Sequence, residues 1–194
     1  MRTTTIRAAV AAGVLLLAGA CTDDGPAPVD PTSSWSPTGT IDPPSPSSSA
    51  GPVEPTLPDA AREASEAGAR AFIEYYWELV NYAQVTGDVK ALRKASGKTC
   101  GGCTKGIAAV EDLYGAGGRA EGGEYKLTIT RIKPIEAADR SLHGCKARFE
   151  VRNAEQTIMH GDGRREVMTA ATTNYLSYLI WLDGAWRMDV LEPQ

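Results

Sequence analysis

The chain has no hydrophobic run long enough to cross a bilayer as a helix. Its one extended apolar stretch, residues 8–17, is shorter than the roughly 20 apolar residues that a spanning helix needs. No second run of that length follows later in the sequence. The sequence therefore predicts contact with a membrane at the N-terminal end only.

Basic residues are too few for a nucleic-acid-binding protein. Without residues 1–20 the chain has 18 basic and 24 acidic side chains, a formal charge of −6, whereas nucleic-acid-binding domains are basic as a rule. From residue 58 onward, 19 acidic and 18 basic residues nearly cancel. The sequence pattern indicates no basic stripe and no phosphate-binding loop, and we expect no nucleic-acid partner.

Basic residues are absent altogether from residues 22–57, which hold nine Pro, seven Ser and five acidic residues. A segment of this composition cannot bury enough apolar surface to offset its ordering entropy. We therefore expect three parts: a signal at 1–20, a disordered tether at 21–57, and one globular domain at 58–194.

The N-terminus has the layout of a secretory signal. Arg2 and Arg7 precede the apolar stretch, and three small residues come directly before Cys21. The stretch resembles a bacterial lipobox, with Ala18 at the usual Leu position. The resemblance implies that Cys21 becomes the lipidated N-terminus and that the chain is held on the extracytoplasmic face of the cell membrane. An uncleaved signal anchor and an ordinary secreted protein are the alternatives.

Three helices are predicted in the first half of the domain. The Ser/Thr-x-x-acid pattern from Thr56 to Asp59 indicates the start of a long helix, and Gly87 indicates its end. Asp88 caps a short second helix and Thr104 caps a third. On the long helix, apolar residues recur at spacings of three and four: Ala64, Gly68, Phe72, Tyr75, Tyr76, Leu79, Tyr82 and Ala83.

In the second half of the domain the apolar period changes from about 3.6 to 2, which is typical of strands. Residues 145–151 alternate most clearly, and residues 125–130 precede a phase change or strand end. Residues 165–182 are expected as one long strand, either regular or with a bend or bulge. Asp183-Gly184 is a two-residue hairpin signal. Helices first and antiparallel strands afterwards predict an α+β domain with the helices on one face of the sheet.

This element order, with a curved sheet closing on residues 181–187, resembles the NTF2-like, cone-shaped fold of ketosteroid isomerases and nuclear transport factor relatives. A further set of motifs covers about residues 68–127: Tyr75-Tyr76 to Leu79, Asn81-Tyr82-Ala83, Thr86-Gly87-Asp88, Leu92, Cys100-x-x-Cys103, Tyr114-x-x-Gly117-Gly118 and Glu121-Gly122-Gly123-Glu124. These motifs resemble an uncharacterised actinobacterial lipoprotein family, a domain of unknown function. The resemblance implies the anchor and the fold, and it supplies no activity.

The most specific chemical motif of the domain is the pair Cys100 and Cys103. The predicted export places them in an oxidising compartment, where two thiols three residues apart readily form a disulfide. A thioredoxin-like dithiol needs its first Cys at a helix N-terminus beside a strand, and we expect this pair in a loop between helices. One of the two thiols could instead pair with Cys145, or both could bind zinc together with His143 and Cys145. We expect the disulfide, a buried and inert Cys145, and no metal or cofactor.

If the sheet closes into a cone, its mouth could hold a small molecule. The aromatic residues expected to line it are Phe72, Tyr75, Tyr76, Tyr178 and Trp181, together with Tyr175. Core packing explains the same residues equally well. Isomerase-type catalysis needs a carboxylate inside the apolar pocket, and no acidic residue lies at an inward position of the predicted strands.

The sequence thus predicts a membrane-anchored extracytoplasmic lipoprotein whose domain binds an envelope protein or a small ligand without catalysis. A small-molecule enzyme that uses an NTF2-like pocket is a second hypothesis. A Cys-x-x-Cys thiol oxidoreductase is a third.

Overall fold

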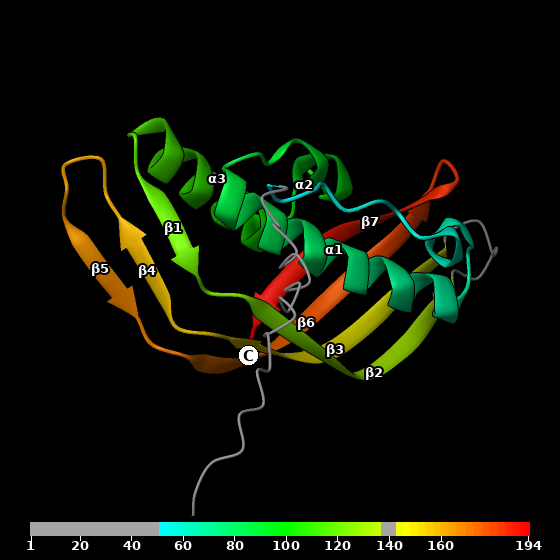
Figure 1. Ribbon diagram of the computed structural model, residues 1–194. Coiled ribbons are helices and arrows are strands. Elements are labelled where there is room, and N and C mark those ends of the chain that lie inside the picture. Colours follow the sequence, from blue (N-terminus) through cyan, green and yellow to red (C-terminus); the bar gives the residue numbers. More distant parts are fainter. Residues whose placement is uncertain (1–50, 137–142) are drawn as a thin grey trace, which may run out of the picture. The chain divides into compact units, whose positions relative to one another are not determined.

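The computed structural model describes residues 51–136 and 143–194 (Figure 1). The predicted signal, the predicted lipidation site Cys21 and most of the predicted tether lie outside these residues. The described elements, in chain order, are the 3-10 helix η1 (Asp59–Arg62), α1 (Glu66–Thr86), α2 (Lys90–Ala95), α3 (Gly101–Gly115), β1 (Arg119–Gly122), β2 (Tyr125–Glu136), β3 (His143–Asn153), β4 (Gln156–Met159), β5 (Arg165–Met168), β6 (Ala171–Leu182) and β7 (Ala185–Pro193).

The long helix α1 begins later than predicted. The pattern from Thr56 to Asp59 starts only η1, after which Glu63 is extended, with φ −115° and ψ 140°. The side chain of Ser65 then accepts a hydrogen bond from the Gly68 N–H at 3.0 Å and caps α1. The prediction of one helix from Thr56 was wrong because Ser65 offers an oxygen to the first turn, whereas Pro58 makes no side-chain capping bond.

The buried face of α1 is wider than the predicted stripe. Gly87 ends the helix with a left-handed φ of 77°, as predicted. Most of the predicted stripe is buried, but Ala64 is exposed, while Ile73 and Trp77, which the stripe omitted, are buried. The face is wide because α1 contacts η1 and α2 as well as strands β1 and β2.

The third helix begins earlier than predicted. The N-cap of α2 is Val89, and the predicted cap Asp88 lies one residue before it, where its carboxylate accepts a hydrogen bond from the Lys90 N–H at 3.0 Å. α3, however, starts at Gly101 with Cys100 as its N-cap, and the Thr104 hydroxyl donates back to the Cys100 carbonyl oxygen at 2.7 Å. The prediction of a loop was wrong because the two glycines occupy a first turn, where backbone N–H groups need no intrahelical acceptor. The Cys-x-x-Cys motif therefore spans the N-cap and the first turn of α3.

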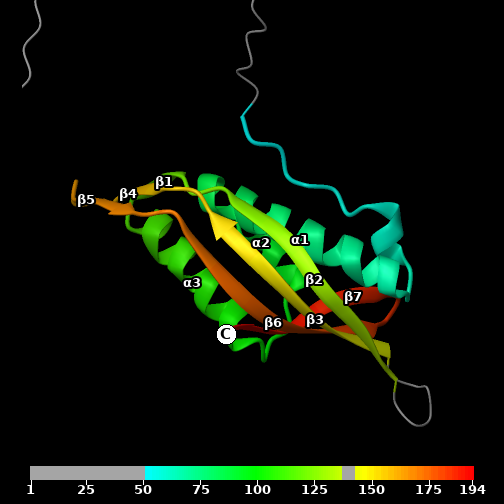
Figure 2. The ribbon, with the colours of Figure 1, turned by 90° about the horizontal axis from the view of Figure 1, so that it is seen from below.

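The strands form two antiparallel sheets (Figure 2). One has the order β2-β3-β6-β7 and the other has the order β1-β4-β5. The prediction of one strand over residues 165–182 was wrong, because β5 pairs with β4 and β6 pairs with β3 and β7. The chain changes sheets between them, where the Asn153 side-chain amide donates a hydrogen bond to the Thr169 carbonyl oxygen at 3.2 Å.

Three strand predictions are confirmed. The register shift between Ile129 and Arg131 is the expected phase change in β2, and it keeps Ile132 buried. Asp183 and Gly184 have φ of 52° and 77° and join β6 to β7 in a two-residue hairpin. In β3 the inward residues are all buried: Cys145, Ala147, Phe149 and Val151.

The helices cover one face of the four-stranded sheet, and the hydrophobic core lies between the two layers (Figures 1 and 2). The three-stranded sheet extends beyond it and lies beside α3. This is the predicted α+β architecture. Figure 2 shows β2 and β3 in front of the helices, so no described helix covers their opposite face. In the described part of the chain, no helix is long and apolar enough to cross a bilayer.

Candidate functional site

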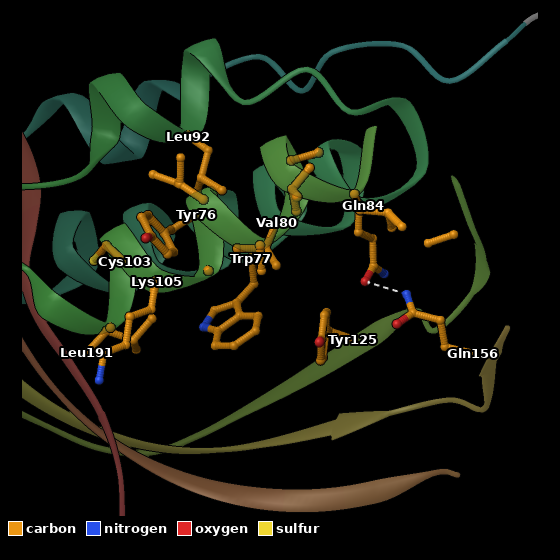
Figure 3. A pocket seen from close by; sticks show the side chains of 18 of the residues that line it. Tyr76, Trp77, Val80, Gln84, Leu92, Cys103, Lys105, Tyr125, Gln156 and Leu191 are labelled. Atoms are coloured by element: carbon orange, nitrogen blue, oxygen red, sulfur yellow. Dashed lines mark hydrogen bonds between the residues drawn. The ribbon is translucent and has the colours of Figure 1, made fainter. Parts of the chain in front are cut away.

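A cavity of about 430 Å³ lies beneath α1 and α3 and above the strands (Figure 3). Its lining is mainly apolar, with contributions from all three α-helices and from both sheets, including the C-terminal strand β7. The two long helices supply most of it: Tyr76, Trp77, Val80, Ala83 and Gln84 from α1, and Cys103, Ile107, Val110, Leu113 and Tyr114 from α3. These positions recur at spacings of three and four, so each helix presents one continuous face to the cavity.

Trp77 combines close packing with an unused hydrogen-bond donor. Its side chain is 6% exposed, and its ring meets the rings of Tyr125, Phe149 and Tyr175 at centroid distances of 5.3, 6.1 and 5.5 Å, all edge to face. In Figure 3 the ring hangs from α1 into the space above the sheet. Its Nε1–H is buried and has no hydrogen-bond acceptor among the described protein atoms. Such a donor is costly to leave unpaired.

A pair of glutamines forms a polar wall of the cavity. Gln156 Nε2 donates to Gln84 Oε1 at 3.0 Å, the bond drawn in Figure 3. Gln84 Nε2 donates in turn to the Gly123 carbonyl oxygen at 2.8 Å, and the Tyr114 hydroxyl donates to the Gln84 carbonyl oxygen at 2.9 Å. Both polar atoms of the buried Gln84 side-chain amide therefore have hydrogen-bond partners, and these bonds hold α1 against the turn between β1 and β2.

Burial keeps three tyrosines of the lining, Tyr76, Tyr125 and Tyr175, neutral at physiological pH. Burial raises the pKa of Tyr76 to about 12, against a smaller lowering by the hydrogen bond that joins its hydroxyl to that of Ser96 at 3.0 Å. Burial also raises the pKa of Tyr125 and of Tyr175. Among the described lining residues, Lys105 is the one charged side chain, and no carboxylate or histidine is present.

The structure places one of the five expected lining residues in the cavity. Tyr76 lines it, as does Tyr175. Phe72 instead packs in the core against Tyr75 and Tyr76, and Trp181 packs against Trp186 at a centroid distance of 5.3 Å. The ring of Tyr178 lies under Lys146 Nζ at 5.3 Å, on the uncovered face of the sheet. The expectation for Phe72, Tyr75, Tyr178 and Trp181 was wrong because the cavity lies beneath α1 and α3 and toward the three-stranded sheet, and none of the four lines it.

The two cysteines of the motif are joined in a disulfide with an S–S distance of 2.00 Å. Both are buried, with exposures of 1% and 3%, and Cys103 lines the cavity. Cys145 is a free, buried thiol, and burial raises its pKa to about 11, with a smaller contribution from the charge of Glu66. Two of the four candidate zinc ligands are therefore bonded to each other. The fourth, His143, begins β3.

Three acidic residues of the strands, Glu150, Glu166 and Asp189, lie outside the cavity. Glu150 is exposed on β3. Glu166 accepts hydrogen bonds from His160 at 3.1 Å and Arg164 at 3.2 Å in the exposed β4–β5 hairpin, and these bonds lower its pKa. Asp189 receives two hydrogen bonds from the Arg187 guanidinium, at 2.6 and 3.0 Å. All three are therefore in positions that serve solubility or local structure.

The model of one protein family, described as "Family of unknown function (DUF6318)", matches residues 41–192. The chain belongs to the DUF6318 family. The match covers almost all of the described domain and extends well beyond the residues 68–127 on which the sequence resemblance rests. Among curated proteins, none matches the sequence.

Several solved structures resemble this DUF6318 domain in outline. The intermembrane-space region of the chloroplast protein ARC6 has 11% identity and a TM-score of 0.48, over 66% of this chain and 95% of that one. A variant of Rd1NTF2_05 has 14% identity and a TM-score of 0.40, over 66% and 96%. The Kfla4162 protein from Kribbella flavida has 14% identity and a TM-score of 0.40, over 67% and 92%. These likenesses concern the fold alone.

Proposed function

We propose that this domain binds a small apolar ligand in the cavity beneath α1 and α3, at the outer face of the cell membrane, and without catalysis. The cavity carries the proposal. Its volume of about 430 Å³ lies within the roughly 300–1,000 Å³ of small-molecule sites, and such sites have an apolar lining with few polar groups, as this one has.

The chemistry of the lining limits the class of ligand. The faces of α1 and α3 favour an apolar body, since burying apolar surface is the main gain on binding. The buried Trp77 Nε1–H lacks an acceptor among the described residues and is covered by protein atoms, so a ligand oxygen reaches it only when the ring turns toward the cavity; that pairing removes an existing cost. The ligand is therefore an apolar molecule with a hydrogen-bond acceptor such as a carbonyl or ether oxygen.

The same lining argues against both enzymatic hypotheses. An isomerase of the ketosteroid type needs a carboxylate base in its pocket, and the described lining offers neutral tyrosines, amides and the exposed Lys105. Cys100 does stand at a helix N-terminus, as thiol oxidoreductases require. Exchange also requires that a thiolate reach a sulfur atom, and both sulfurs lie in residues that are nearly fully buried.

The membrane anchor rests on the sequence of the first 21 residues. We expect acyl-labelled protein to be recovered from membranes of the native host, with Cys21 as its first residue. Cys21→Ala is expected to lose the acyl label completely, because the thioether bond needs that sulfur. The measurement is metabolic labelling with a radioactive fatty acid, followed by N-terminal sequencing. Label that persists in Cys21→Ala would refute the anchor and leave the cavity proposal untouched.

Filling the cavity tests ligand binding. Val110 lines the cavity, and Ala108, on the same helix, is exposed and does not line it. We expect protein from the native host to yield an apolar small molecule on organic extraction. Val110→Trp is expected to lower the extracted amount at least about tenfold, because the indole occupies ligand space. Ala108→Trp should leave it unchanged. Equal yields of extracted ligand from both variants, or no extractable molecule from the wild type, would contradict the proposal.

A further inference from the structure

The uncovered face of β2 and β3 carries a dense group of cations, here called the basic face. Six of its side chains are basic, and Glu150 is the one acid between them. The basic residues are Lys126, Arg131, Lys133, Lys146, Arg148 and Arg152, all exposed except Lys146, which is partly buried. Figure 2 looks onto these strands from the side opposite the helices. This local excess of positive charge is not apparent from the net charge of the whole domain, which is close to zero.

The β-bulge of β2 creates the arrangement. Because the register shifts between Ile129 and Arg131, Ile132 points into the core while Arg131 and Lys133 join the outward face. Arg131 then lies directly opposite Arg148, and Lys133 lies directly opposite Lys146. A shallow depression of about 170 Å³ is lined by these four residues alone.

This arrangement is unfavourable in the absence of a partner. Like charges directly opposite each other on neighbouring strands destabilise a sheet. Within the described residues, none of the four central cations has an ion pair, and Lys126 alone among the six contacts an acid, Glu124, at 3.8 Å. The contact of Lys146 Nζ with the Tyr178 ring offsets a part of this charge repulsion. A surface that keeps this repulsion is suited to a partner with many negative charges.

We propose that the basic face docks on the phosphate headgroups of an anionic membrane surface. The four central cations share one depression, but Lys126 lies roughly 20 Å along β2 from Lys133, at about 3.3 Å per residue, so the whole face is larger than one phosphate. A membrane is favoured over a nucleic acid because the lipid predicted at Cys21 would hold the basic face near lipid headgroups. The proposal involves neither the cavity nor its ligand, and a lipid at Cys21 would only bring the face closer to the membrane.

Lysine acylation of the full chain on vesicles tests the proposal. With vesicles of phosphatidylglycerol and phosphatidylcholine in equal parts, labelling of Lys126 and Lys133 by an N-hydroxysuccinimide ester is expected to fall several-fold relative to pure phosphatidylcholine. Labelling of Lys94 and Lys98, which are exposed on and just after α2, should not change. Molar NaCl should abolish the difference, because salt screens surface charges. Mass spectrometry of peptides gives each rate.

Paired variants give the control. Each Lys or Arg near an anionic surface contributes about fivefold to binding, so Arg131→Gln with Arg148→Gln should weaken docking about 25-fold. Its melting temperature should rise by about 1–3 °C, because the repulsion is relieved. Arg62→Gln with Arg70→Gln removes two exposed charges from η1 and α1 and should dock as the wild type does. Equal protection on both vesicle types, unchanged docking by the first variant, or stronger protection by duplex DNA or glycerol phosphate would each overturn the proposal.

Discussion

Gly102→Ala is expected to destabilise the domain by about 3 kcal/mol, although Ala is the better helix former. Gly102 lies in the first turn of α3, directly against β7. A Cβ added there would overlap the Leu191 carbonyl oxygen and lie 3.1 Å from the carbonyl carbon. Both atoms belong to the backbone of a paired strand and cannot rotate away. The start of α3 must therefore move, and with it the disulfide and one wall of the cavity.

Gly101→Ala is the matched control for this prediction. A Cβ at Gly101 meets nothing within 4 Å. Replacing Gly by Ala in a helix gains up to about 1 kcal/mol when no clash occurs, so Gly101→Ala should be neutral or slightly stabilising. Urea unfolding followed by circular dichroism measures both variants. Similar unfolding midpoints for the two variants would mean that α3 does not pack against β7 as described.

Local sequence signals predicted the layer architecture but not where each element begins. The alternation in β3, the Asp183-Gly184 hairpin and the stop at Gly87 depend on neighbouring residues, and all three are confirmed. The start of α1 is set by a local cap at Ser65 that the prediction missed, whereas the division of residues 165–182 depends on contacts made elsewhere. Residues 165–168 and 171–182 are both strand-like, and only pairing with β4 and with β3 separates them.

The cavity was misplaced for a similar reason. The sequence shows that Tyr76 and Trp77 lie on one helix, but the alternating pattern cannot show that a second sheet extends beside α3. The prediction that α3 starts at Thr104 left Cys103 outside the helix, although Cys103, Ile107, Val110 and Tyr114 follow a helical spacing. The basic face was missed because its cations alternate with apolar residues and come from two strands that pair through a bulge.

Trp77→Ala is expected to cost about 4 kcal/mol of unfolding free energy. Large buried aromatic side chains lose about 3–5 kcal/mol when cut back to Ala, and the Trp77 ring contacts three other rings at once. The change would also add the volume of the indole to the existing cavity, so the surrounding side chains cannot fill the space that the indole leaves. Urea unfolding of delipidated, ligand-free protein measures the loss. A cost below about 1 kcal/mol would contradict the described packing.

Trp77→Phe separates packing from hydrogen bonding at the same position. Phe keeps an aromatic ring against Tyr125, Phe149 and Tyr175 but removes the buried Nε1–H, which has no acceptor among the described residues. Removing an unpaired donor relieves about 1–3 kcal/mol, which offsets the smaller ring, so ligand-free stability should stay within about 1 kcal/mol of the wild type. Ligand recovery should nevertheless fall about tenfold, because a ligand acceptor loses its donor. Unchanged ligand recovery would show that the indole N–H takes no part in binding. A loss of stability as large as that of Trp77→Ala would show that the N–H already has a hydrogen-bond partner within the fold.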